Sequence, residues 1–252
     1  MNQPLLSLDH VDKSFGGLRV IHDVSFTVET GSRTALIGPN GAGKTTLFNL
    51  ISGVYDLDQG SIHLDGHDIS QVPSPARCRY GLSRSFQNIR LMPHLSTVEN
   101  VMLGQHSQSS KLGMLFPLGL GRNRWVRQAE DELHTAGLDT YRGQIVADLP
   151  YGIQKRIEVV RALMANPKLL LLDEPAAGLN ATETDALLAL LQRISENGVT
   201  LLVVEHDMHF VARLCQEVVV LNFGEKIFQG TPDGAQKEPA VLEAYLGTDH
   251  VT

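Results

Sequence analysis

A glycine-rich segment carries the clearest chemical pattern in the sequence. Residues 38–46 read GPNGAGKTT, which matches G-x-x-x-x-G-K-[ST] and sits between an apolar segment and a helix-like one. Glycines let successive backbone N–H groups face inward, and a following helix N-terminus adds partial positive charge, so such a loop cradles phosphates. Lys44 would reach the β and γ phosphates, and the Thr45 hydroxyl would ligate Mg²⁺. The pattern predicts a nucleoside triphosphate site formed by Gly38, Pro39, Asn40, Gly41, Ala42, Gly43, Lys44, Thr45 and Thr46.

Two adjacent carboxylates indicate which reaction the site could catalyse. A phosphate loop alone does not, because kinases, GTPases and motor ATPases all have one. Asp173 and Glu174 follow the apolar run LLLL at residues 169–172, which places them at the end of a buried strand. Side chains alternate along a strand, so one carboxylate can hold Mg²⁺ while the other faces an attacking water as general base. A solvated surface pair is the alternative, and the buried position argues against it.

The strands that must position these groups fall into two kinds. Residues 5–30 contain two β-rich segments, and residues 61–69 contain the hairpin signal Asp65-Gly66, which together predict an antiparallel layer. The short, wholly apolar runs at 169–172 and 199–204 are typical of parallel strands buried on both faces.

Helical patterns alternate with the parallel strands. Apolar residues recur with helical spacing over residues 154–165 and 181–196, and residues 124–136 form another helical segment. Strand alternating with helix indicates a doubly wound α/β core. We interpret residues 88–151 as an inserted, mostly helical stretch, interrupted by a glycine-rich loop at residues 113–121.

Composition excludes several classes of protein. The 252 residues include 28 acidic and 21 basic side chains, and this net charge of −7 argues against a nucleic-acid partner. No apolar run approaches the roughly 18 residues of a membrane span, and the N-terminus lacks a signal-peptide pattern. Cys78 and Cys215 form no CxxC motif, so a reducing cytoplasm is expected.

Taken together, the motifs resemble those of the ATP-binding cassette (ABC) ATPases over residues 5–247. The resemblance implies a single α/β domain with a RecA-like P-loop core, an N-terminal antiparallel β layer and an inserted helical subdomain. The core would occupy residues 5–87 and 168–235, the helical subdomain residues 88–167, and a C-terminal tail residues 236–252.

The same resemblance assigns roles to residues outside the phosphate loop. Phe15, which lies 29 residues before Lys44, would stack on adenine. Gln87, in the segment RSFQNIRL, would touch the metal and sense the transport partner. Asn180 ends the D-loop, where the common form has Asp.

The family pattern also implies a catalytic set and a metal set. Asp173 corresponds to the Walker B metal ligand and Glu174 to the catalytic base. His206, after the apolar strand, corresponds to the switch histidine that contacts the γ phosphate. The catalytic residues would thus be Glu174, His206 and Gln87, and the Mg²⁺ ligands Thr45, Gln87 and Asp173. A metal held by His206 with His209 is the alternative reading of the histidine, and it lacks a third ligand.

The signature motif departs from the family pattern. Residues 149–154 read LPYGIQ where the common sequence contains L-S-G-G-Q. In the family this motif completes the partner subunit's ATP site across a head-to-tail dimer. The segment here would supply backbone N–H groups and a helix dipole but no serine hydroxyl. The residues expected to act in trans are Pro150, Tyr151, Gly152, Ile153 and Gln154.

Within the family, the segments RSFQNIRL, DEPAAGLN and AVLEAYLG resemble ATPases of branched-chain amino acid importers. Such proteins pair with a sister ATPase or with themselves, under two integral-membrane permeases fed by a periplasmic or surface solute-binding protein. The expected location is therefore peripheral, on the cytoplasmic face of the inner (plasma) membrane. Importers of urea or short-chain amides have similar motifs. A soluble clamp ATPase of DNA repair or translation is the rival class, and a non-catalytic nucleotide-binding module is a weaker one.

Overall fold

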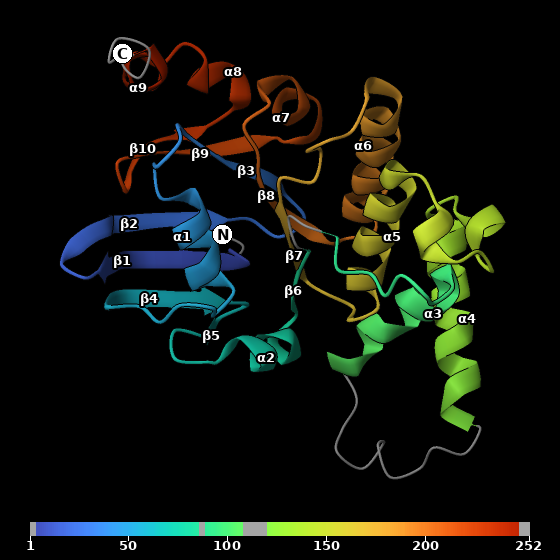
Figure 1. Cartoon of the computed structure of the whole chain (residues 1–252). Helices are drawn as coiled ribbons and strands as arrows, with labels where there is room; N and C mark the ends of the chain where they lie inside the picture. The colour runs from blue at the N-terminus through green and yellow to red at the C-terminus, as the bar shows by residue number, and fades with distance from the viewer. Residues whose placement is uncertain (1–3, 86–88, 108–119, 247–252) are drawn as a thin grey trace.

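The computed structural model describes residues 4–85, 89–107 and 120–246, and two sheets dominate it (Figure 1). The first sheet has the strand order β2-β1-β4-β5, and all of its neighbouring strands are antiparallel. Its members are β1 (Leu6–Phe15), β2 (Leu18–Val28), β4 (Gln59–Leu64) and β5 (His67–Asp68). The turn between β4 and β5 falls at Asp65-Gly66, so the predicted antiparallel layer and its hairpin are confirmed.

The second sheet has the order β10-β9-β3-β8-β7-β6 and is parallel except at β10. Its central strands β7 and β8 are buried along their whole length, which explains their apolar runs LLLL and LLVV. The strands are β3 (Arg33–Ile37), β6 (Leu82–Arg84), β7 (Leu169–Asp173), β8 (Thr200–Val204), β9 (Glu217–Asn222) and β10 (Glu225–Gly230). The prediction of a parallel α/β core is confirmed.

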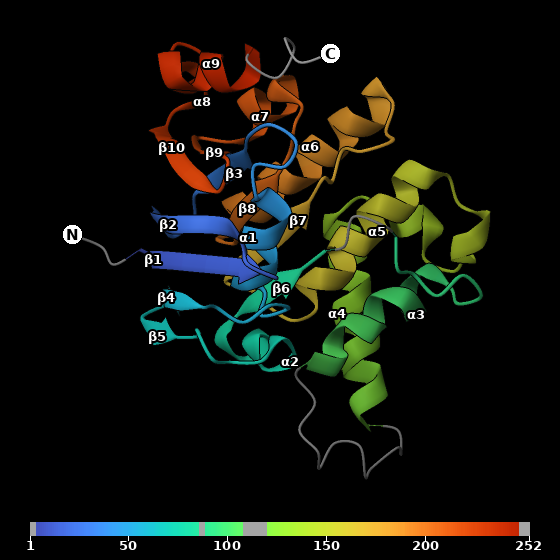
Figure 2. The ribbon, with the colours of Figure 1, turned by 60° about the vertical axis from the view of Figure 1, so that its left-hand side comes forward.

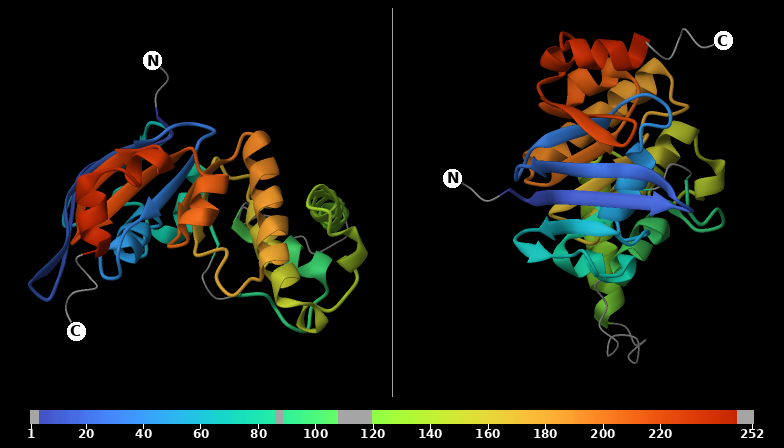
Figure 3. Two further views of the ribbon diagram at one scale, coloured as in Figure 1. Left: turned by 90° about the horizontal axis from the view of Figure 1, so that it is seen from above. Right: turned by 90° about the vertical axis from the view of Figure 1, so that its left-hand side faces the viewer.

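Helices cover both faces of the parallel sheet. Those of the first half are α1 (Lys44–Ile51), α2 (Ser74–Arg77), α3 (Thr97–Met102) and α4 (Leu120–Thr135). The second half adds α5 (Tyr151–Leu163), α6 (Ala181–Glu196), α7 (Met208–Leu214), α8 (Pro232–Ala235) and α9 (Pro239–Leu246). Seen from above, α6 lies between the sheet and the helices of the insertion (Figure 3). Helix α5 packs on α6, and α3 and α4 pack on α5.

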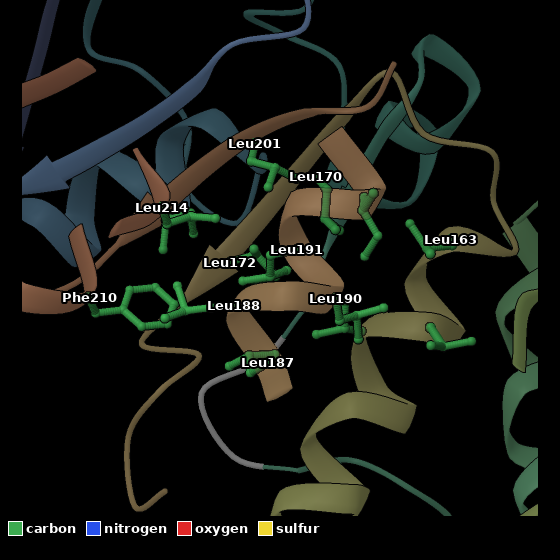
Figure 4. Close-up of a cluster of buried hydrophobic side chains, with 14 of the residues drawn as sticks. Leu163, Leu170, Leu172, Leu187, Leu188, Leu190, Leu191, Leu201, Phe210 and Leu214 are labelled. Atoms are coloured by element: carbon green, nitrogen blue, oxygen red, sulfur yellow. The ribbon is translucent and has the colours of Figure 1, made fainter. Parts of the chain in front are cut away.

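Alternating side chains of the parallel strands divide the core in two. Leu169 and Leu171 face α1 and the antiparallel sheet, whereas Leu170 and Leu172 face α5 to α7. Figure 4 shows the second cluster, in which leucines of α6 meet those of β7. At the β10 edge of the parallel sheet, α8 and α9 lie beside β10 (Figure 2). Within the described ranges, no helix is both long and apolar enough to cross a bilayer.

Two helix boundaries differ from the sequence prediction. Helix α5 runs over Tyr151–Leu163 rather than 154–165, because Pro150 takes the N-cap position and the helix begins directly after it. At the other end, Asn166 has a left-handed φ of 48°, which stops the helix early. Helix α4 begins at Leu120, inside the predicted glycine-rich loop at residues 113–121, while residues 113–119 of that loop lie outside the described part.

A buried arginine stabilises the C-terminal end of α1. The side chain of Arg77 is 1% exposed, and its guanidinium donates to the carbonyl oxygens of Leu50 and Ile51 at 2.7 Å. It also donates to the carbonyl oxygen of Val72 at 2.8 Å. The Leu50 and Ile51 carbonyls lie in the last turn of α1, where helical partners run out, and Leu50 also accepts from the Gly53 N–H at 3.1 Å, so Arg77 helps to cap this end of the helix. Burial lowers the pKa of Arg77 to about 10, which leaves it charged at neutral pH.

We expect Arg77→Met to destabilise the fold by roughly 3 kcal/mol, because the buried carbonyl oxygens lose the hydrogen bonds that the guanidinium donates. Urea unfolding followed by circular dichroism measures the change. Arg79→Met removes an exposed arginine two residues away and serves as the matched control. Equal shifts of the midpoint for the two variants would contradict the capping role.

Candidate nucleotide site

Strand register brings the predicted motifs to one edge of the parallel sheet. Leu36 of β3 pairs with Val204 of β8, and Val204 also pairs with Asp173 of β7. The Glu174 N–H then donates to the Val204 carbonyl oxygen at 2.9 Å. The phosphate loop after β3, the carboxylates after β7 and His206 after β8 therefore meet at the carboxyl ends of adjacent strands, where open α/β sheets bind ligands.

The phosphate loop has glycine where no other residue fits. At Gly38, with φ +148°, a Cβ would lie 2.1 Å from the carbonyl oxygen of Leu221. Gly43, with φ +99°, is the N-cap of α1, and a Cβ there would lie 2.8 Å from Ile21. The loop is thus packed tightly against β9 and β2, which fixes the direction in which the first turn of α1 points.

Lys44 lies inside this loop. Its ammonium group donates to the carbonyl oxygens of Gly38 at 2.6 Å and of Pro39 at 2.9 Å. Burial lowers the pKa of Lys44, and the negative charge of Glu174 opposes that shift. The Glu174 carboxylate is therefore close enough to the phosphate loop to interact electrostatically with the Lys44 ammonium.

Glu174 has an unusual backbone conformation. Its φ is +46°, in the left-handed region that residues with a Cβ rarely occupy. Such a conformation costs on the order of 1 kcal/mol or more, and residues that retain it are concentrated at functional sites. The preceding Asp173 is buried, and its carboxylate accepts a hydrogen bond from Arg84 at 2.9 Å. The two acids therefore differ in environment, as the sequence argument expected.

Glu205 is a site residue that the motif analysis missed. Its side chain is 1% exposed and accepts hydrogen bonds from the N–H groups of Ala176 at 3.0 Å and His206 at 3.3 Å. Burial raises the pKa of Glu205, and these hydrogen bonds oppose the rise. Glu205 thus joins the backbone of His206 to the loop that follows Glu174. Its position at the end of the buried strand β8 is the signal that could have revealed it.

Phe15 forms an exposed aromatic group at the end of β1. The residue is 41% exposed, and the ring of Tyr55 meets it edge-on with centroids 5.1 Å apart. The Lys13 ammonium lies over the Phe15 ring, 5.4 Å from its centroid, and also pairs with Asp58 at 2.7 Å. Because these neighbours leave the ring 41% exposed, its open part can stack against a planar base.

The signature segment contacts the D-loop region within the same chain. Pro150 is the N-cap of α5 and makes no side-chain capping bond. The Gly152 N–H donates to the Glu183 carboxylate at 3.3 Å, and Glu183 forms a capping box with Asn180 at the start of α6. A Cβ on Gly178 would touch the Tyr151 ring at 3.3 Å. The signature helix and α6 are thus joined through their N-termini.

The structure therefore brings together the phosphate loop, Asp173, Glu174 and His206. Gln87 lies outside the described residues, so its predicted contact with the metal stays a prediction. Within the described ranges, no group of three or more His, Cys, Asp or Glu side chains is placed to hold a metal.

The sequence of the chain matches that of known proteins over nearly its whole length. The ABC transporter family matches residues 21–177, which contain the phosphate loop and both carboxylates. The chain belongs to the ABC transporter family. The branched-chain amino acid ATP-binding cassette transporter family matches residues 225–251. This ABC protein is an ATP-binding, ATP-hydrolysing transporter subunit, as the motifs predicted.

Individual relatives of this ABC ATPase agree with that assignment. It is 40% identical to BraF of Pseudomonas aeruginosa, a high-affinity branched-chain amino acid transport ATP-binding protein, over 98% of this chain and 99% of BraF. It is 36% identical to LivG of Escherichia coli K12, of the same description, again over 98% and 99%. The crystal structure of an ABC transporter cassette in its ADP conformation superposes with a TM-score of 0.87 at 28% identity, covering 98% of this chain and 100% of that one. The RecA-like cassette fold is thereby confirmed.

We expect Glu174→Gln to bind Mg-ATP as the wild type does but to hydrolyse it about 10² to 10⁴ times more slowly, the usual effect of removing a general base. Equilibrium ATP binding and single-turnover hydrolysis measure the two quantities. Lys44→Ala should instead weaken binding, and Glu196→Gln, on an exposed position of α6, should change neither. A comparable loss of ATP affinity in Glu174→Gln would rule out the base assignment.

Phe15→Ala should raise the KM for ATP about five- to hundredfold, the range expected for loss of base stacking on an aromatic ring. Phe15→Tyr keeps the ring and should remain close to the wild type. Thermal unfolding of both variants separates this role from a structural one in the β layer. A large drop in melting temperature with unchanged ATP affinity would assign Phe15 to the core instead.

Proposed function

We propose that the chain is the ATP-hydrolysing subunit of an importer for branched-chain amino acids. The supporting observation is similarity that extends from end to end of BraF and LivG and includes the C-terminal match at residues 225–251. Uptake of urea or short-chain amides by the same machinery is the alternative solute assignment. The whole chain would act as one ATPase domain, with residues 88–167 as its helical subdomain.

The residues around the phosphate loop would bind ATP. Phe15 stacks on adenine, and the loop N–H groups and the α1 N-terminus hold the phosphate oxygens. The Lys44 ammonium lies on the loop's inner side and pairs with the β and γ phosphates. Because burial weakens competition from water, this charge binds an anion more strongly than an exposed lysine would.

The donor set fits Mg²⁺. The exposed Thr45 hydroxyl at the start of α1 and the Asp173 carboxylate are hard oxygen ligands of the kind that this ion selects, and Gln87 would add an amide oxygen. The ion would neutralise phosphate charge during phosphoryl transfer. Glu174, whose charge acts on Lys44, would accept a proton from the attacking water, and the exposed His206 would contact the γ phosphate.

The site would be completed by a second ATPase. In a head-to-tail dimer, residues 150–154 of each chain face the partner's phosphates, and the first turn of α5 offers N–H groups to them. Two permeases would contact Gln87 and the segment that follows it, so that closure and reopening of the dimer move them. The protein would therefore lie at the cytoplasmic face of the inner membrane, supplied by a solute-binding protein outside.

Transport by the reconstituted complex tests this function. The chain would be combined in proteoliposomes with candidate permeases, a solute-binding protein and a second ATPase from the same organism. ATP-dependent uptake of labelled leucine, isoleucine and valine, abolished by Glu174→Gln, is the expected result. Uptake of urea or a short-chain amide in place of leucine would overturn the solute assignment. Failure to associate with any permease would overturn the importer itself.

The altered signature predicts a defect when the chain works alone. Each site of a homodimer would lack the serine hydroxyl, and a charge-assisted hydrogen bond of that kind contributes about 1.5 to 3 kcal/mol. Such a loss slows turnover roughly tenfold to hundredfold if it acts in the transition state. We expect Pro150→Ser, or addition of the sister ATPase, to raise hydrolysis by the purified chain.

Pro150→Ala is the matched control, since it removes the proline without adding a hydroxyl. Equal rates for the alanine and serine variants would assign any gain to the backbone rather than to the hydroxyl. Brisk wild-type turnover that rises with protein concentration and is not improved by Pro150→Ser would show that the backbone N–H groups of α5 suffice.

A further inference from the structure

Arg84 connects the phosphate-loop helix to the Asp173 carboxylate. Its Nη2 donates to Oδ2 of Asp173 at 2.9 Å, and its Nη1 donates to Oδ1 of Asn49 at 2.6 Å and to Oγ of Ser52 at 2.9 Å. The guanidinium carbon also lies 4.9 Å from the centroid of the Phe48 ring. Asn49 and Phe48 belong to α1 and Ser52 directly follows it, so one side chain is fixed to the helix and to β7 at the same time.

The ion pair between Arg84 and Asp173 is largely shielded from bulk water. The side chain of Arg84 is 14% exposed and that of Asp173 is 8% exposed. A charged pair at this depth is screened little, and its geometry is constrained by every hydrogen bond that the guanidinium makes. The planar fork of arginine is suited to such bridging, because its nitrogens point in fixed directions toward different partners.

We propose that Arg84 is a positioning residue that fixes the Asp173 carboxylate relative to α1, so that this carboxylate can bind the divalent cation. The inference rests on the proposed function, in which Thr45, at the second position of α1, and Asp173 supply oxygen ligands to that ion. Arg84 then fixes the two ligands relative to each other, since it joins the helix that carries Thr45 to the carboxylate of Asp173. Groups that orient metal ligands in this way contribute about tenfold to hundredfold in metal affinity.

The direction in which metal affinity changes when Arg84 is removed distinguishes a positioning role from simple charge pairing. A guanidinium that only neutralised Asp173 would compete with a cation, so removing it would strengthen metal binding. A guanidinium that orients the carboxylate has the opposite effect, so removing it weakens metal binding. Lysine can keep the charge, but its single ammonium group cannot reproduce the fork between Asp173 and Asn49.

The test measures how much Mn²⁺ strengthens ATP binding, with Mn²⁺ as the probe for the divalent ion. Variants are made in the Glu174→Gln background so that ATP is not consumed, and the Kd for ATP is measured in EDTA and in excess Mn²⁺. We expect Arg84→Met and Arg84→Lys to reduce the gain from Mn²⁺ about tenfold or more, with the Kd in EDTA unchanged. An unchanged or larger gain in Arg84→Met, or a full gain in Arg84→Lys, would overturn the proposal.

Further variants keep the test informative. Arg33→Met removes another partly buried arginine, one that donates to the Leu214 carbonyl oxygen at 2.6 Å, and should leave the gain intact. If Arg84→Met does not fold, Asn49→Ala loosens the same guanidinium on its helix side and should also lower the gain. Asp173→Asn should abolish the gain whatever Arg84 does. A full gain in Asp173→Asn would overturn the metal assignment itself, whereas loss there with no effect at Arg84 would overturn only the positioning role.

Discussion

The parallel register of β3, β8 and β7 is the constraint on which the site depends. Because Val204 pairs with both Leu36 and Asp173, the three strands end level with one another. A slip of one residue would turn each strand's buried faces around and would also separate the phosphate loop from the carboxylates. Leucines that alternate between two separate core clusters prevent such a slip. The packing that stabilises the sheet therefore also sets the spacing of the chemical groups.

Buried charges around the site act as ties between elements. Arg77 joins the segment after β5 to the end of α1, and Arg84 joins β6 to α1 and β7. Glu205 joins the end of β8 to the loop after β7. Each such group loses its hydration on folding. Only a complete set of hydrogen-bond partners compensates for that loss. Their joint effect is to make the position of α1 relative to the carboxylates sharply defined.

The sequence was sufficient to predict the elements whose signals are local. The leucine pattern of α6, the four-leucine strand β7 and the Asp65-Gly66 turn each depend on neighbouring residues, and the phosphate loop depends on the spacing of its glycines. The start of α5 was missed because Tyr151 lies outside the apolar stripe that marks the helix. Arg84 was missed for a different reason: its carboxylate partner is 89 positions away, and no periodicity reports such a pair.

The left-handed backbone of Glu174 sets stability against activity at a single position. Glycine occupies such a φ without strain, so Glu174→Gly would relieve an unfavourable conformation while removing the carboxylate. Selection for a sturdier fold alone would favour that replacement, and selection for turnover opposes it. A search for more thermostable variants of this protein should therefore yield inactive substitutions at this residue. That the residue is glutamate indicates that selection for turnover has outweighed selection for stability.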